Sequence, residues 1–303
     1  MMRITDSMMT SSYLRNLSRN QQNVQKYQNQ LSSMKEVSKP SDNPLLVSEI
    51  MNLKTSITQN EQYQTTIEDA ISWTNMQDSA LSNASNSLMR IKTLVQSAAN
   101  DTMSEEGRTA VKAEIETEIA TFVDALNTEF GGRHIFGGTE TTTVPFVIEK
   151  DADGKMTGIS YQGTDENISR EIASGVTVQI PSSGGGLLNE QADGTNLGSL
   201  LSDVLQGLDD NNADSMRDSL GKLDKEIDNV VTSRTEIGAV TNRMKSAQAR
   251  NESQELGLSE MLSSKEDIDF AEKYMQFNME FVAYQASLQM GTRVLQTTIL
   301  DYL

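Results

Sequence analysis

The chain has 303 residues, with 25 basic and 43 acidic side chains and a formal net charge of −18. Such an acidic chain is repelled by the phosphate backbone, so nucleic acid is not an expected partner. It contains no cysteine, which excludes disulfide frameworks and thiolate metal sites. No segment approaches the roughly 20 apolar residues of a membrane span, and no apolar signal-peptide core is visible, so neither membrane insertion nor a cleaved signal is expected.

The first third of the sequence predicts helix, because no glycine precedes Gly107 and the only prolines there are Pro40 and Pro44. Residues 5–35 form the first predicted helix, and the segment 39–44 ends it, since proline restricts its neighbour and has no N–H. A stripe at steps of three and four residues marks one face of this helix. Its members are Tyr13, Leu17, Asn20, Val24, Tyr27, Leu31 and Met34.

Two further helices are predicted at about 45–99 and at 105–130. The first of them carries two apolar faces, which indicates that it is contacted from more than one side. Polar residues interrupt one of these faces. They are Asn60, Gln64, Asp78 and Lys92.

The composition then changes, because 13 of the 19 glycines fall between residues 131 and 198. Alternating apolar residues and an Asp153-Gly154 turn predict a small antiparallel β domain at 143–181. The Ser/Gly run at 182–186 is predicted to be a flexible linker.

Helix is predicted again from about residue 197 and over 213–255, with a break at Gly257. Ser263 and Glu266 have the spacing of a capping box for the last helix. That helix carries a second stripe with alternate steps of four and three. Its positions are Phe270, Tyr274, Phe277, Phe281, Tyr284, Leu288, Gly291, Leu295, Thr298 and Tyr302.

The predicted fold class is therefore mainly α with an inserted β domain, in which the N- and C-terminal segments form a long helical rod or coiled coil. Five parts are expected along the chain: an N-terminal assembly helix, two parts of a helical rod domain flanking the β domain, and a C-terminal assembly helix. Their boundaries are 1–44, 45–138, 139–186, 187–258 and 259–303.

No sequence motif in the chain indicates an enzyme, and no catalytic, cofactor-binding or metal-binding residue is predicted. His134 is the only histidine, which excludes a two-histidine zinc motif, and nothing local supplies a triad. The glycine pairs around it lack the Lys-Ser/Thr of a phosphate loop. Residues 151–154 resemble the start of a calcium-binding loop. Position 12 of such a loop is a glutamate that binds calcium, but here it is Gln162, so a hairpin turn is the better explanation.

The two terminal stripes are the candidate functional feature. Each is too narrow to stabilise a helix alone in water, so the termini need each other or neighbouring subunits. The alternative is ordinary packing within one monomer. The predicted assembly residues are Tyr13, Leu17, Val24, Tyr27, Leu31, Phe270, Tyr274, Phe277, Phe281, Tyr284, Leu288, Leu295 and Tyr302.

Four short segments carry a family resemblance: the opening 2–9, the Ser-Lys-Pro-Ser-Asp-Asn-Pro break at 38–44, the segment 132–139, and the ending 287–303 with Leu-Asp-Tyr-Leu. Together they resemble the flagellar hook-associated protein 3 family, the flagellin-like hook–filament junction proteins. Met34 stands where that family often has glycine, and Thr297-Thr298-Ile299 replaces a more usual proline-containing approach to the end.

The resemblance implies a structural protein of the bacterial flagellum, exported unfolded by the flagellar type III apparatus without a cleaved signal. It implies a ring of identical subunits between the first hook-associated protein and flagellin, an export chaperone, and no enzymatic activity or cofactor. The termini are expected to order on assembly. The alternatives are a flagellin-type filament subunit and a type III-secreted translocator or needle-tip-like helical protein.

Overall fold

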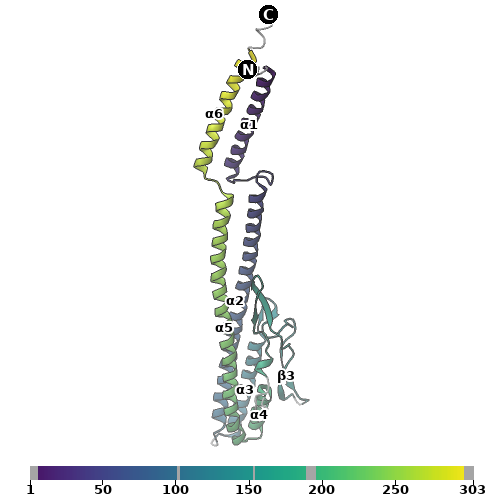
Figure 1. The fold of residues 1–303 in the computed structure, drawn as a ribbon. Helices are drawn as coiled ribbons and strands as arrows, with labels where there is room; N and C mark the ends of the chain where they lie inside the picture. The colour runs from purple at the N-terminus through teal and green to yellow at the C-terminus, as the bar shows by residue number, and fades with distance from the viewer. Residues whose placement is uncertain (1–5, 101–102, 153, 189–195, 297–303) are drawn as a thin grey trace. The chain divides into compact units, whose positions relative to one another are not determined.

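The computed structural model describes residues 6–100, 103–152, 154–188 and 196–296 (Figure 1). Helix dominates this part of the chain, as predicted. The helices are α1 (Asp6–Ser33), α2 (Pro44–Ala98), α3 (Glu105–Leu126), α4 (Leu197–Asp209), α5 (Ala213–Glu266) and α6 (Phe270–Gln296). Pro44 is the first residue of α2, where its missing N–H removes no helical hydrogen bond.

The chain divides into two compact units. The terminal unit comprises residues 1–59 and 253–303, and the central unit comprises residues 60–252. The long helices α2 and α5 each contribute residues to both units. The five-part division expected from the sequence stays a prediction, since these two units follow a different criterion.

The strands lie in the central unit and form antiparallel pairs. They are β1 (Glu129–Phe130), β2 (Arg133–His134), β3 (Phe146–Lys150), β4 (Met156–Tyr161), β5 (Ile168–Ala173) and β6 (Val176–Ile180). The pairs β1–β2, β3–β4 and β5–β6 are separate two-stranded sheets. The β3–β4 hairpin turns at Gly154, whose φ of +80° favours glycine, as the Asp-Gly signal predicts. Helix α3 ends at Leu126, and β1 follows at Glu129–Phe130, so the helix predicted at 105–130 extended too far at its C-terminal end.

One core holds helices and strands of the central unit together. Both faces of α2 contribute to it, as the double stripe predicted: Leu88 and Ile91 are each fully buried. Asn127 binds the edge of β3, because its side chain accepts from Phe146 N at 2.9 Å and donates to Phe146 O at 2.8 Å. The strand pairs therefore complete the helical core and do not fold apart from it.

The polar gaps on α2 have partners. Asn60 and Asn251 of α5 exchange side-chain hydrogen bonds of 3.1 and 2.9 Å. Asp78 accepts from Arg234 at 3.0 Å, and Lys92 forms an ion pair with Asp224. The buried Asn60–Asn251 pair fixes the register of α2 against α5, since a buried amide that loses its partner costs about 1–3 kcal/mol. The fourth polar gap, Gln64, instead donates to Glu68 of α2 itself at 2.8 Å.

The segment 182–186 is not a flexible linker, and that prediction is wrong. Ser182 is fully buried, and Gly184 N donates to Phe136 O at 3.0 Å. A Cβ at Gly184 would lie 2.4 Å from Phe146 Cζ, so glycine allows the backbone to pack against this ring. The 3₁₀ turn η1 (Gly185–Leu187) follows directly.

The predicted break at Gly257 and the capping box at Ser263 are also wrong. Helix α5 continues through Gly257 to Glu266, because one glycine costs a helix only about 1 kcal/mol. Ser263 remains inside α5. The N-terminal turn of α6 is capped by Asp269, whose carboxylate accepts from Ala271 N at 2.9 Å.

Candidate assembly interface

The two terminal helices lie side by side in the terminal unit and run antiparallel (Figure 1). Near one end of the pair, the Tyr13 hydroxyl donates to Ser287 O at 2.9 Å. Near the other end, Lys273 Nζ lies 5.9 Å from the centroid of the Tyr27 ring. Between them, Asn20 Nδ2 donates to Ser287 Oγ at 3.0 Å. Residues from opposite ends of the sequence thus meet, as expected.

Gly291 allows α1 to approach α6 closely. A Cβ at this position would lie 2.0 Å from Tyr13 Oη, which no side chain could tolerate without movement. The Tyr13 ring therefore packs directly against the buried backbone of Gly291.

The α1 stripe predicted from the sequence faces α6. Its six helical members are all half-buried: Tyr13, Leu17, Asn20, Val24, Tyr27 and Leu31. Met34, the seventh, lies beyond the end of α1 with φ of +58° and is exposed. The stripe on this helix is therefore a contact seam from Tyr13 to Leu31, and Met34 takes no part in it.

The α6 stripe divides between two faces. Phe277, Tyr284 and Gly291 are half-buried or buried on the side that contacts α1. Phe270, Tyr274, Phe281 and Leu288 are exposed, by 40% to 52% of their surface. The seam against α1 is instead completed by polar or charged residues that sequence reasoning did not select. They are Lys273, Gln276, Glu280 and Ser287.

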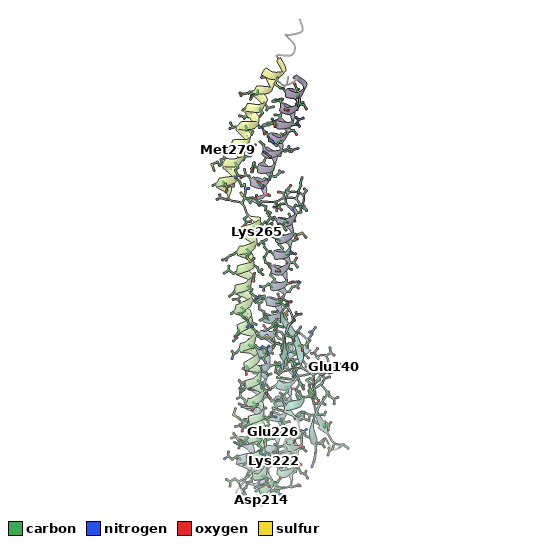
Figure 2. The ribbon with its side chains drawn as sticks, viewed as in Figure 1. Glu140, Asp214, Lys222, Glu226, Lys265 and Met279 are labelled. Atoms are coloured by element: carbon green, nitrogen blue, oxygen red, sulfur yellow. The ribbon has the colours of Figure 1, made fainter. Side chains whose placement is uncertain are left out.

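Further apolar side chains are exposed around α6. Figure 2 shows Met279 on the side of α6 turned away from α1, and this side chain is 68% exposed. The others are Met275, Val282 and Met290. Among the described side chains of α1 and α6, no apolar one is fully buried. A helix with apolar residues on all sides needs more than one neighbour to cover it.

Two of the predicted assembly residues cannot be placed. Tyr302 lies outside the described residues, and the side chain of Leu295 is likewise undescribed. The remaining eleven lie on α1 or α6. Their role between subunits stays a prediction.

The connections α1–α2 and α5–α6 meet in a segment that we call the elbow, residues 34–43 and 266–269. Lys35 forms an antiparallel bridge with Asp267, and Glu36 N donates to Glu266 O at 2.8 Å. Ile268 N donates to Met34 O at 3.4 Å. Backbone hydrogen bonds thus join the two connections just where α1 and α5 end.

Glu266 is the charged centre of the elbow. Its carboxylate, 10% exposed, lies 2.5 Å from Lys35 Nζ and 2.8 Å from Lys54 Nζ. Burial alone would raise the pKa of Glu266, but the hydrogen bonds and charges of the two lysines outweigh burial and lower its pKa. The same contacts raise the pKa of Lys35. The spacing of Ser263 and Glu266 predicted a capping box, and no local signal distinguishes that role of Glu266 from an ion pair with Lys54.

The residues considered for chemistry have structural roles in the central unit. His134 is buried, with Nδ1 3.0 Å from Asn127 O and Nε2 3.5 Å from a Glu129 carboxylate oxygen. The glycines beside it, Gly131 and Gly132, both have positive φ. Across the described ranges, no three His, Cys, Asp or Glu side chains are grouped to hold a metal ion. No helix in the described part of the chain is long and apolar enough to cross a bilayer.

Two family models match the two ends of the chain. The bacterial flagellin N-terminal helical region matches residues 4–141, and the bacterial flagellin C-terminal helical region matches residues 220–303. Together these ranges span most of the sequence. The chain belongs to the flagellin family.

Within this family the chain is similar to flagellar hook-associated protein 3. It is 28% identical to that protein of Escherichia coli K12 and 24% identical to that of Salmonella typhimurium LT2, each over 96% of both chains. The solved flagellar hook-associated protein 3 of Legionella pneumophila has the same fold. It aligns with a TM-score of 0.60 and 16% identity, over 71% of this chain and 98% of that one.

The elbow of this flagellin-family chain contains a strained residue. Met34 has φ of +58°, a conformation that costs a non-glycine residue roughly 1–2 kcal/mol. Glycine would remove this strain but would lose more entropy on folding, by roughly 0.5–1 kcal/mol. We expect Met34→Gly to stabilise the elbow by about 0.5–1 kcal/mol. The measurement is the free energy of opening from hydrogen exchange of the Glu36 amide.

The control is Met51→Gly, at an exposed methionine inside α2. Here glycine should cost about 1 kcal/mol, because the backbone is helical. Faster exchange at Glu36 in Met34→Gly would show that the left-handed turn does not limit the elbow.

The ion pairs of Glu266 predict a pH dependence. Because its pKa is lowered on folding, Glu266 stabilises the elbow fully above its ordinary pKa of 4.5 and progressively less as the pH falls through the folded pKa. We expect Glu266→Gln to destabilise the elbow at neutral pH and to abolish the loss of Glu36 protection below pH 4.5. The control is Glu49→Gln, which breaks the exposed pair with Lys265. An unchanged acid profile in Glu266→Gln would contradict this assignment.

Proposed function

We propose that this chain is a structural subunit of the bacterial flagellum that forms the junction between hook and filament. The observation that carries the proposal is α6, whose apolar residues surround the helix while α1 covers only one side. The flagellin-family match at both ends and the similarity to hook-associated protein 3 over 96% of the chain support the same conclusion.

The subunit acts by assembly, without a catalytic step. Several copies form a ring, and in that ring the exposed residues of α6 contact helices of neighbouring subunits. Contacts between identical subunits arranged head to tail close into a ring when the rotation between them permits it. The paired termini form the inner layer of this ring.

The two faces of the ring contact different partners. One face joins the first hook-associated protein, and the other receives flagellin. The shared flagellin-type termini explain how one helical layer continues from the junction into the filament. Specific pairing depends on which polar and aromatic residues meet at each step, because unmatched polar groups disfavour the wrong neighbour.

The subunit reaches this position through the flagellar type III apparatus, unfolded and without a cleaved signal. The absence of cysteine removes any disulfide that would hinder such transport. Before export, a chaperone covers the C-terminal segment, because a helix exposing Met275, Met279 and Phe281 would otherwise associate with other apolar surfaces.

The terminal helices gain most of their stability on assembly. In the single chain, the described part of the α1–α6 pair buries no apolar side chain fully, whereas the central unit has a continuous core. We expect fast hydrogen exchange for residues 8–33 and 270–292 in the monomer and slow exchange in assembled flagella, with Leu88 and Phe122 amides protected in both. Strong protection of both terminal segments in the monomer would refute this.

Substitution at the exposed face of α6 tests assembly directly. Phe281 is 40% exposed in the single chain, so Phe281→Asp should leave the monomer's melting temperature nearly unchanged. In a strain carrying only this variant we expect at least a tenfold loss of filaments per cell, because a buried unpaired carboxylate opposes subunit contact. The readouts are electron microscopy and immunoblotting of sheared flagella.

Two further variants serve as a control and as a second test of the Phe281→Asp experiment. Val231→Asp replaces an exposed apolar residue of α5, 46% exposed, and should leave filament number intact. Val24→Asp places a charge in the seam between α1 and α6 and should impair assembly while also weakening the monomer's helical pairing. Normal filaments and motility in both Phe281→Asp and Val24→Asp would overturn the proposed role of the termini.

A further inference from the structure

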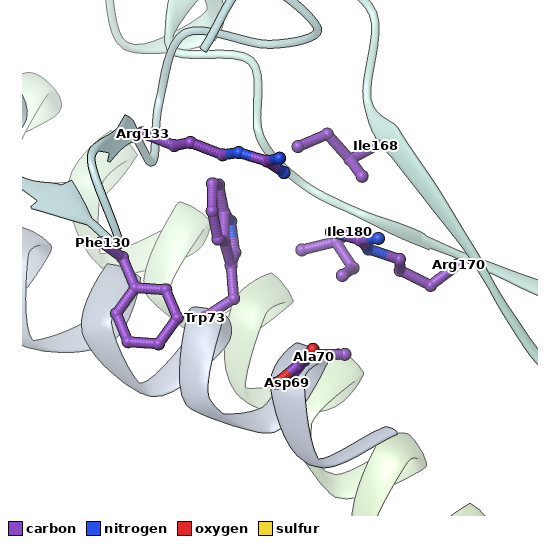
Figure 3. A pocket seen from close by; sticks show the side chains of 9 residues that line it. Asp69, Ala70, Trp73, Phe130, Arg133, Ile168, Arg170 and Ile180 are labelled. Atoms are coloured by element: carbon purple, nitrogen blue, oxygen red, sulfur yellow. The ribbon is translucent and has the colours of Figure 1, made fainter. Parts of the chain in front are cut away.

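The central unit contains a pocket where α2 meets the strands β2, β5 and β6. Its volume is about 240 Å³. Figure 3 shows its lining: Trp73 stands on α2, Arg133 extends across its upper rim, and Arg170 approaches from the other side. Ile168, Ile180, Ala70 and Phe130 form the apolar wall, and Asp69 lies at the edge.

Trp73 provides an unused hydrogen-bond donor in this pocket. The side chain is only 6% exposed, yet its indole N–H has no acceptor among the described residues. Figure 3 shows the nitrogen on the side of the indole that faces Ile168 and Ile180. Buried indole N–H groups usually find an acceptor, so this one is available to a bound molecule.

Two guanidinium groups converge on the same space. Arg133 belongs to β2 and Arg170 to β5, so separate strand pairs hold them. Within the described part of the chain, neither guanidinium has an ion pair or a side-chain hydrogen bond. Arginine presents a planar fork of donors that matches a carboxylate or phosphate.

The net charge of the side chains lining the pocket favours a carboxylate over a phosphate. Asp69 contributes one negative charge beside the two arginines, which leaves a single positive charge to be neutralised. A carboxylate matches this charge, whereas a phosphate dianion exceeds it. The isoleucine and phenylalanine wall further favours an anion attached to apolar atoms.

We propose that this pocket binds a carboxylate carried on a small apolar body, held by Arg133 and Arg170 and by a hydrogen bond from the Trp73 indole N–H. The carboxylate can belong to a free organic acid or to an acidic side chain of another polypeptide. This site goes beyond the assembly function and does not depend on it.

The chain contains a single tryptophan, so its fluorescence reports on this pocket alone. The full-length monomer is titrated with 3-phenylpropanoate, with its neutral amide 3-phenylpropanamide, and with inorganic phosphate. A second arm uses the peptide N-acetyl-Ala-Leu-Glu-Leu-Ala-amide and its Gln counterpart. We expect a saturable change in emission with the carboxylate or the Glu peptide, and at least tenfold weaker binding of the amide and the Gln peptide.

Variants connect the signal to the named residues. Arg133→Gln and Arg170→Gln should each weaken carboxylate binding about tenfold, as expected for loss of one charge-assisted hydrogen bond. Asp69→Asn should strengthen it, which a damaged fold would not do. Arg243→Gln, an exposed arginine of α5, should change nothing.

The arms separate the sources of the carboxylate. Binding of 3-phenylpropanoate alone identifies a free acid, and binding of the Glu peptide alone identifies a polypeptide side chain. The proposal is overturned if no probe gives a saturable change in emission, if the neutral probes bind as well as the acids, or if phosphate binds more tightly than the carboxylates. It is also overturned if Arg133→Gln and Arg170→Gln keep a native circular dichroism spectrum and still bind carboxylate normally.

Discussion

Pairing between opposite ends of the sequence is the constraint on which this structure depends. The Asn60–Asn251 contact closes a separation of 191 residues, Lys54–Glu266 one of 212, and Tyr13–Ser287 one of 274. Loop-closure entropy rises only slowly with length, but it must be met before such contacts form. The central core meets this cost, because α2 and α5 are joined there through buried apolar layers and matched polar pairs. With α2 and α5 joined, the loops that the terminal contacts must close are short, so these contacts cost little further loop-closure entropy.

The elbow shows how the terminal unit is fixed without a large core. A buried carboxylate that lost its lysine partners would be strongly destabilising, so Glu266 allows only arrangements that keep both Lys35 and Lys54 nearby. Met34 adds strain at the same place. This combination restricts the elbow to one conformation, in keeping with the proposal that the terminal helices gain most of their stability on assembly.

The sequence predicted what depends on local chemistry. Proline at 40 and 44, the two faces of α2 and the Asp-Gly hairpin all correspond to observed elements. The failures share one cause, which is that tertiary contacts override a local signal. Gly257 stays helical within the long α5, Glu266 pairs across more than 200 residues, and Gly184 packs against Phe146 in the segment predicted to be a flexible linker.

The contact seam between α1 and α6 within the chain was predicted only in part. On α1 the apolar stripe and the contact seam coincide, because this helix is otherwise polar. On α6 apolar residues occur on several faces, so spacing alone cannot tell which face meets α1; the structure assigns Lys273 and Ser287 to the seam and leaves Phe281 outside. The Trp73 pocket gave no signal at all, since its residues come from three distant segments.

In the proposed assembly, the exposed apolar side chains of α6 set the free energy of subunit association. Eight large apolar side chains of this helix are 40% to 68% exposed: Phe270, Tyr274, Met275, Met279, Phe281, Val282, Leu288 and Met290. Covering what remains exposed on each is worth roughly half of the 1.5–3 kcal/mol for full burial, or about 6–12 kcal/mol together. Association itself costs about 4–15 kcal/mol. A neighbour that covers one side of α6 supplies about half of that stabilisation, or about 3–6 kcal/mol, which lies at or below most of the cost range. The proposed incorporation of a subunit therefore depends on contacts with more than one neighbour.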